Sequence, residues 1–165
     1  LEDSIKAIRA LFNNAKDLKS VIAKYIDEHD SMRKDIERMQ AEVVKRAKET
    51  LLQKARHENG VTIVSAILPM TAASVKDLAF GIREQVKENL LCVIGSIDND
   101  KPMLTVMLSD DMVKDHQLNA GQMVREAAKL IQGGGGGQPH FATAGGKDKD
   151  GLSAAVDKLV ALANI

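Results

Sequence analysis

Two glycine-rich stretches near the C-terminal end are the residues whose spacing best suits binding chemistry. The first runs from Gly133 to Gly137, and the second is Gly145-Gly146. Glycine leaves the backbone bare, so that N–H groups can reach an anion or a flat partner can approach closely. No Gly-Lys-Ser/Thr follows the run, and the glycines follow an expected helix, which excludes a P-loop and a dinucleotide fingerprint. The pattern predicts a loop that presents its backbone to a ligand.

A flexible linker is the other interpretation of five consecutive glycines. The run contains no serine, however, and apolar residues follow it at Phe141, Ala142 and Ala144. It also lies between two well-patterned helical segments, where a floppy linker would interrupt the fold. An ordered loop is therefore the favoured interpretation.

Charge near the glycines indicates an anionic partner. Lys147 and Lys149 flank the second glycine pair, although Asp148 and Asp150 weaken their field. Lysine plus arginine equal aspartate plus glutamate, 23 against 23, so binding of a nucleic acid requires a local basic patch. A second basic cluster lies late in the N-terminal helical segment. For each of its residues taken singly a solvated helix face is the favoured interpretation, and as a group they are candidates for phosphate contacts. Its members are Lys45, Arg46, Lys48, Lys54 and Arg56.

The remaining side chains favour no catalytic or metal-binding role. Aromatic residues make up only 2% of the chain, which argues against a pocket of stacked rings. Cys92 and the histidines show no spacing typical of metal ligands, and no nucleophile lies beside a general base. His140, beside Pro139, is a candidate polar contact, with a purely structural role as the alternative. We expect no catalytic residue, no metal and no cofactor in this chain.

The single cysteine favours the cytosol, because Cys92 cannot form an internal disulfide. The sequence contains no signal peptide and no apolar run long enough to cross a bilayer, so no membrane partner is expected. Leu1 falls within a helical pattern, and we expect the chain to be a fragment of a longer protein.

Residues 1–58 contain neither proline nor glycine and predict a helical arm. A first short helix begins at Ser4, and Asn13-Asn14 interrupts it. From about Lys16 the apolar residues follow the heptad spacing of a coiled coil, over a helix of about 40 residues and about 60 Å. The heptad seam consists of Leu18, Ile22, Tyr25, His29, Met32, Ile36, Met39 and Val43. A second chain or the first helix must cover this seam, so a coiled-coil dimerisation module is one functional alternative.

Residues 60–165 predict a small globular domain. Gly60, after Asn59, is expected to cap the C-terminal end of the arm helix. The expected strands are 61–68, 91–97 and 103–108, the last two as a hairpin. The expected helices begin at Ser74, at the cap residue Asn119 and at residue 152, and residues 109–117 form a loop or a short helix. Alternating strands and helices indicate the α/β or α+β class, with a mixed sheet covered by helices in two or three layers. The sequence does not determine the order of the strands in this sheet.

The segment that contains both glycine stretches resembles a known signature. Gln138-Pro139-His140 follows the glycine run, and Ala142-Thr143-Ala144-Gly145-Gly146-Lys147-Asp148 comes next after Phe141. A glycine run, a short polar stretch that often contains proline, and then Ala-x-Ala-Gly-Gly-Lys-Asp form the pattern of the DHH-associated domain, in the version found at the C-terminus of alanyl-tRNA synthetase. The coiled-coil-like helical segment before a small α/β domain also resembles that family.

The resemblance implies a tRNA-binding domain without catalytic residues. In that family the domain contacts the outer corner of the L-shaped tRNA, presents the tRNA to the aminoacylation and editing sites of the parent chain, and in some members contributes to dimer formation. The parent would be a cytoplasmic, ATP-dependent alanine–tRNA ligase that uses magnesium and zinc, and its other domains would be partners. In phosphoesterase relatives a Gly-Gly-His helps to hold the substrate phosphate, but here Gln138 and Pro139 intervene.

The resemblance therefore implies a C-terminal tRNA-binding domain that contacts the tRNA elbow and couples aminoacylation to editing in the parent enzyme. The alternatives are the dimerisation module and a DHH-type phosphoesterase accessory domain. Both glycine segments are expected to form one RNA-facing surface. The predicted contact residues are Gly133, Gly134, Gly135, Gly136, Gly137, Gln138, His140, Gly145, Gly146, Lys147, Lys149, Lys45, Arg46, Lys54 and Arg56.

Overall fold

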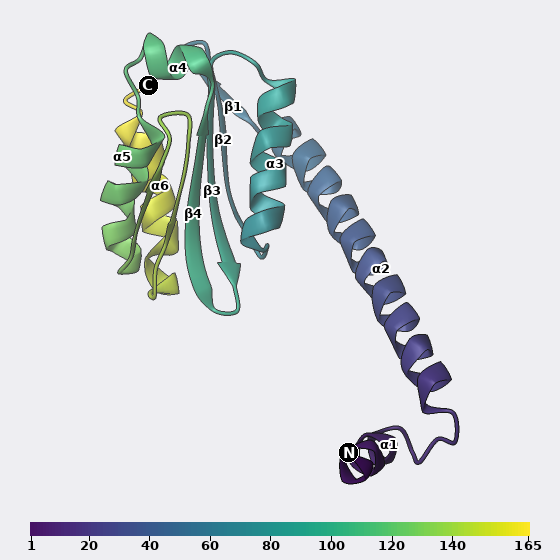
Figure 1. Ribbon diagram of the computed structural model, residues 1–165. Helices are drawn as coiled ribbons and strands as arrows, with labels where there is room; N and C mark the ends of the chain where they lie inside the picture. Colours follow the sequence, from purple (N-terminus) through teal and green to yellow (C-terminus); the bar gives the residue numbers. More distant parts are fainter. The chain divides into compact units, whose positions relative to one another are not determined.

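A computed structural model describes residues 1–165, which divide into two compact units (Figure 1). The first unit is Leu1–Ala41, and the second is Glu42–Ile165. The predicted fold class is confirmed, because a long helix precedes a mixed α/β domain with a six-stranded sheet. None of the helices combines the length and the apolar composition that a membrane-spanning segment requires.

The first unit contains helix α1 (Glu2–Leu11) and the beginning of helix α2 (Leu18–Gln53). The predicted break between them is confirmed, because Asn13 and Asn14 adopt left-handed φ angles of 54° and 55°. Helix α2 begins after Asp17, whose carboxylate accepts hydrogen bonds from the Ser20 hydroxyl at 2.6 Å and the Ser20 N–H at 3.1 Å. These bonds lower the pKa of Asp17. The exposed residues of the predicted heptad seam in this unit are Tyr25, His29, Met32, Ile36 and Met39.

Helix α2 ends at Gln53, whereas the sequence predicted a helical arm up to residue 58. Residues Arg56–Glu58 form strand β1, which pairs antiparallel with strand β2 (Val61–Leu68). Asn59 and Gly60 connect the two strands with φ angles of 49° and 80°, which is the geometry of a two-residue type I′ turn. The prediction of a helix cap at Gly60 is therefore wrong. Asn-Gly is typical both of a helix C-terminal cap and of a hairpin turn. Here it forms the turn, because β1 pairs with β2.

The sheet has the strand order β1-β2-β3-β4-β6-β5. Strand β3 (Leu90–Asp98) runs parallel to β2, and helix α3 (Ala72–Gln85) connects them; all other neighbours are antiparallel. The predicted hairpin of β3 and β4 (Lys101–Leu108) is confirmed, with Asn99 and Asp100 in its turn at positive φ.

Side-chain caps mark the N-terminal ends of two helices, α3 and α5. The α3 cap differs from the predicted one. The Thr71 hydroxyl accepts a hydrogen bond from the Ser74 N–H at 3.2 Å, so Thr71 and not Ser74 begins α3. The predicted cap at Asn119 is confirmed, since its side chain accepts from the Gln122 N–H at 3.0 Å. The remaining helical elements are α4 (Asp110–Lys114), α5 (Ala120–Ala127), the 3₁₀ turn η1 (Ala128–Ile131), the 3₁₀ turn η2 (Lys149–Gly151) and α6 (Leu152–Leu162).

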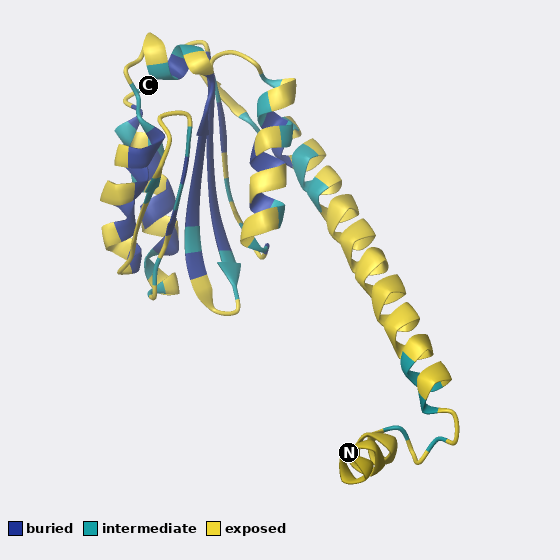
Figure 2. Cartoon of the chain, viewed as in Figure 1, coloured by how far each residue is buried: buried dark blue, intermediate teal, exposed yellow.

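The second unit has three layers, with helices on both faces of the sheet (Figure 1). Helices α5 and α6 cover one face and bury Val93, Val106 and Leu159 with their neighbours. Helix α3 and the end of α2 cover the other face, where Ile82 and Ile94 lie in a second cluster. Figure 2 shows that β3 and β4 are buried over most of their length, because they lie at the centre of both clusters.

Candidate nucleic-acid interface

The glycine run is a strand, whereas the sequence predicted a loop. Residues Gly134–Gly137 form β5, which pairs antiparallel with β6 (Phe141–Gly145) at one edge of the sheet. Glycine has a low strand propensity, but the ladder uses only backbone N–H and C=O groups, which glycine provides. The bare backbone that the sequence predicted therefore exists as an ordered sheet edge.

Alternate glycines of this strand allow the two backbones to approach closely. A Cβ atom on Gly133, Gly135 or Gly137 would overlap a backbone carbonyl oxygen of β6. A Cβ atom on Gly146 would overlap the backbone carbonyl oxygen of Ile131. These four positions require glycine for packing, and a side chain at any of them would displace the hairpin.

The other three glycines of the motif, Gly134, Gly136 and Gly145, have free space where a side chain would project. A Cβ atom on Gly134 or Gly145 would meet no atom within 4 Å, and one on Gly136 would meet only the Arg125 Nε at 3.9 Å. Gly134 and Gly145 are direct cross-strand partners, and both are exposed. This pair is therefore the part of the glycine motif at which a flat partner can reach the backbone without a side chain between them.

An open cavity of about 470 Å³ lies where the two glycine segments meet. Cross-strand pairing aligns Met103, Gly145 and Gly134 in one row over three strands. The residues that line the cavity are Lys101, Pro102, Met103, Gln132, Gly133, Gly145, Gly146 and Lys147. The predicted meeting of the two glycine segments thus occurs at this end of the hairpin.

Two lysines with no ion-pair partner border the cavity. Lys101 and Lys147 line it, and neither has a carboxylate within ion-pair distance. Lys149, which the sequence placed with Lys147, instead pairs with Asp100 at 3.0 Å. The hydrogen bond to Asp100 raises the pKa of Lys149. Lys101 and Lys147 are therefore the cations that remain available to an anion.

The predicted contacts Gln138 and His140 lie at the other end of the hairpin. Both are exposed, and the backbone around them holds the turn: the Gln138 N–H donates to the Phe141 carbonyl at 2.8 Å, and the His140 carbonyl accepts from the Leu108 N–H at 2.8 Å. With a rise of about 3.4 Å per residue, the five steps from Gly133, which lines the cavity, to Gln138 span about 17 Å. One continuous contact surface from Gly133 to His140 would have to extend over this length.

The basic residues of the arm lie apart from the glycine segments. Arg56 belongs to β1, at the opposite edge of the sheet from β5, about 24 Å away at the usual strand spacing. It pairs with Glu58 at 3.3 Å. Lys45 and Arg46 lie within α2 and Lys54 directly follows it, and none of the three lines the cavity. The structure therefore does not bring these four residues together with Lys147.

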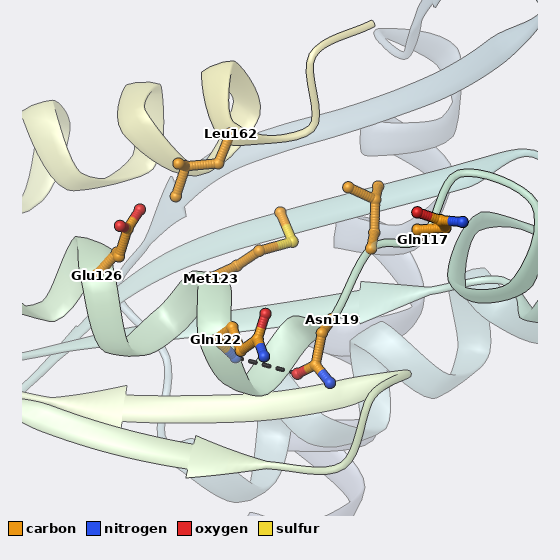
Figure 3. Close-up of a pocket in the computed structure, with 7 residues that line it drawn as sticks. Gln117, Asn119, Gln122, Met123, Glu126 and Leu162 are labelled. Atoms are coloured by element: carbon orange, nitrogen blue, oxygen red, sulfur yellow. Dashed lines mark hydrogen bonds between the residues drawn. The ribbon is translucent and has the colours of Figure 1, made fainter.

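A second cavity, of about 420 Å³, is lined mainly by polar side chains of the α4–α5 connection and α5 (Figure 3). Its polar residues are Gln117, Asn119, Gln122 and Glu126. Figure 3 shows the Asn119 side chain turned to the Gln122 backbone, so its oxygen is used for capping. Glu126 is the only charged residue of this lining, which disfavours a phosphate ligand here. No group of three or more His, Cys, Asp or Glu residues is placed to hold a metal ion.

Sequence reasoning missed Lys101, Met103 and Gln132. Lys101 and Met103 reach the cavity because the β3–β4 turn places the start of β4 beside β6. Gln132 ends η1 with a left-handed φ of 52°. Only the strand order brings these residues to the glycines, and no local pattern reveals that order.

Comparisons with known proteins identify the family of this chain and proteins that share its fold. A family model described as the DHHA1 domain matches residues 59–164. Over all 165 residues the chain is 52% identical to an alanine–tRNA ligase of Bacteroides fragilis strain YCH46, of which it covers 19%. The chain therefore spans about a fifth of the length of the curated relatives it matches.

Two solved structures share the fold. The crystal structure of the C-Ala domain from Aquifex aeolicus alanyl-tRNA synthetase matches with a TM-score of 0.55 and 27% identity, over 64% of this chain and 93% of that chain. RecJ from Thermus thermophilus, solved with Mg²⁺, matches with a TM-score of 0.51 and 15% identity, over 92% of this chain and 21% of that chain. The second likeness shows the fold alone. Because the family model covers more than half of its length, the chain belongs to the DHHA1 domain family.

Proposed function

We propose that the unit Glu42–Ile165 binds tRNA through the surface around its two glycine segments. The observation that carries this proposal is the open backbone of Gly134 and Gly145 beside a cavity bordered by two unpaired lysines, Lys101 and Lys147. Bare backbone admits a flat base pair or a sugar without steric hindrance, and the lysines supply contacts to phosphates. RNA of defined shape is recognised through such contacts without a base-specific code.

The relatives support alanine-specific tRNA as the partner, because those with the highest identity are alanine–tRNA ligases and one solved neighbour is a C-Ala domain. In this proposal the domain contacts the tRNA elbow and is itself not catalytic. The parent enzyme is a cytoplasmic, ATP-dependent ligase whose magnesium and zinc sites lie in its other domains. Contact with the elbow would hold one tRNA while its acceptor end moves between the aminoacylation and editing sites of that parent.

A titration of the 165-residue chain with alanine-specific tRNA at 50 and 200 mM salt tests the proposal. Lys147→Ala should weaken binding and reduce the slope of log affinity against log salt by about 1, because one phosphate contact is lost. Gly134→Val with Gly145→Val should abolish most binding, since the new side chains occupy open space on the proposed contact surface. Lys54→Ala is the matched control, because Lys54 lies outside the cavity.

The proposal fails if the unmodified chain does not bind tRNA, or if the glycine double variant folds normally and binds as tightly as the unmodified chain. Weaker binding by Lys54→Ala with unchanged binding by Lys147→Ala would place the contact surface on the arm cluster instead. Circular dichroism of each variant establishes that the fold is intact.

We infer a second role for helix α2, pairing with the same helix of another copy. Large apolar side chains at its heptad positions are 53–62% exposed, although apolar surface of this extent on a helix normally packs against a partner. These residues are Tyr25, Met32, Ile36, Met39 and Val43. Light scattering should give a dimer mass that Met32→Glu with Met39→Glu converts to a monomer. A monomer mass for the unmodified chain at high concentration would remove this role.

A further inference from the structure

The two aromatic residues of the second unit form one partly exposed pair. The ring centroids of Phe80, on α3, and Phe141, on β6, lie 5.1 Å apart with the rings tilted by 52°. Phe80 is 39% exposed, whereas Leu78 and Ile82 on the same helix are fully buried. Phe141 is half-buried at the rim of the α3-side cluster. The pair therefore combines contact with the core and an aromatic surface that a ligand can reach.

This pair lies on the same face of the sheet as the open glycine backbone. Phe141 packs with the cluster under α3, and side chains alternate along a strand, so Thr143 and Gly145 share its face. Cross-strand partners of these two residues are Gly136 and Gly134. Beyond Phe141, over about 14 Å of β6 up to Gly145, this face therefore carries one small side chain, that of Thr143.

A cation accompanies the aromatic pair. Lys76 lies four residues before Phe80 on α3, which puts the two side chains on one flank of the helix. Lys76 is exposed and has no ion-pair partner, whereas Arg83 on the next turn is committed to Asp110 at 3.5 Å and to the Lys87 carbonyl at 2.9 Å. The strip thus has a cation and an aromatic pair at one end and the cavity with Lys101 and Lys147 at the other.

We propose that Phe80 and Phe141 form a stacking platform for an unpaired base of the bound RNA, which extends the contact surface from the cavity along β6 to α3. This inference rests on the proposed function. Every base has a π-face, so stacking on an aromatic ring is tolerant of sequence, and a bare strip lets the ribose-phosphate chain lie close to the sheet. The low aromatic content of the chain argued against base stacking, but the fold concentrates the aromatic residues of this unit at one place.

A single-tryptophan variant tests the platform directly. The chain contains no tryptophan, so Phe80→Trp introduces one fluorophore at the proposed stacking position. Saturating alanine-specific tRNA should quench this fluorescence, because a stacked base quenches an indole ring. Ile67→Trp is the matched control: Ile67 is 44% exposed on β2, away from β6 in the strand order, and its fluorescence should stay unchanged.

A truncation provides the second readout. Phe80→Ala should weaken tRNA binding by about fivefold or more at both 50 and 200 mM salt, with an unchanged salt slope, because stacking involves no counterion release. Ile67→Ala should bind within twofold of the unmodified chain. If Phe80→Trp is not quenched, or if Phe80→Ala binds as tightly as the unmodified chain, the platform is refuted while tRNA binding stands. If the unmodified chain itself does not bind tRNA, the proposed function fails instead.

Discussion

Two antiparallel hairpins of the sheet, β3–β4 and β5–β6, share the same backbone pairing but differ in their side chains. In the β3–β4 hairpin nearly every side chain is buried, and Ile94, Leu104 and Val106 are fully inaccessible. In the β5–β6 hairpin one strand has no side chains at all. The hairpins are joined directly, because β4 pairs with β6. We infer from this difference that the large side chains at the centre of the sheet stabilise the fold. The lack of side chains at the β5 edge lets a ligand reach the backbone.

The largest expected effect is in the first hairpin. Ile94→Ala should lower the free energy of unfolding by about 2–5 kcal/mol, since it leaves a cavity in a core that cannot collapse fully. Urea denaturation measures this loss. Cys92 reports on the same strand, because burial raises the pKa of its thiol to about 12 and protects it from thiol reagents. Labelling of Cys92 should be faster in this variant, and an unchanged rate would contradict the role of β3 as the stable centre.

Gly135→Ala should have a smaller but clear effect in the second hairpin. The new methyl group would overlap the Thr143 carbonyl of β6, so we expect a loss of about 1–3 kcal/mol, typical of overpacking. Hydrogen exchange should show faster exchange of the β6 amides, and tRNA affinity should fall. Cys92 should remain protected, because β3 lies two strands away from β6. Fast labelling of Cys92 in this variant would show that the two hairpins unfold as one unit.

Gly134→Ala should have the smallest effect on stability and the opposite sign. Its methyl group meets no atom within 4 Å, and the residue has no positive φ angle, so fewer unfolded conformations should raise stability by about 0.4–1 kcal/mol. The same methyl group would hinder a flat partner, and tRNA affinity should decrease. Thermal melts of Gly134→Ala and Gly135→Ala, measured side by side, test whether open glycines and glycines required for packing differ in this way. Similar losses in both would refute the distinction between packing and open glycines.

Local patterns predicted the elements whose side chains are buried on one face. The apolar run at Val61–Leu68 corresponds to β2 residue for residue, because a strand that packs against both core clusters needs such a run. The Asn119 cap was also predictable, since it depends on neighbours within a few residues. These signals are short-range, and the structure preserves them.

The edges of the sheet were not predictable in the same way. Strand β1 has three exposed residues and no apolar pattern, and β5 has no side chains to form one. Both exist because a longer strand supplies a pairing partner. For the same reason the cavity residue Lys101 could not be found from the sequence, since its position beside Gly145 depends on two strand registers. The sequence located the glycine half of the candidate site but not the residues that complete it.

The two edge strands also bear on self-association. An unpaired sheet edge can recruit a strand from another molecule, and such pairing is favoured by long, flat, apolar edges. Strand β1 is three residues long and carries the Arg56–Glu58 ion pair, while β5 consists of four glycines that offer no apolar surface to a neighbouring strand. The glycines that keep the backbone open to a ligand thus also give an intruding strand no apolar side chain to pack against.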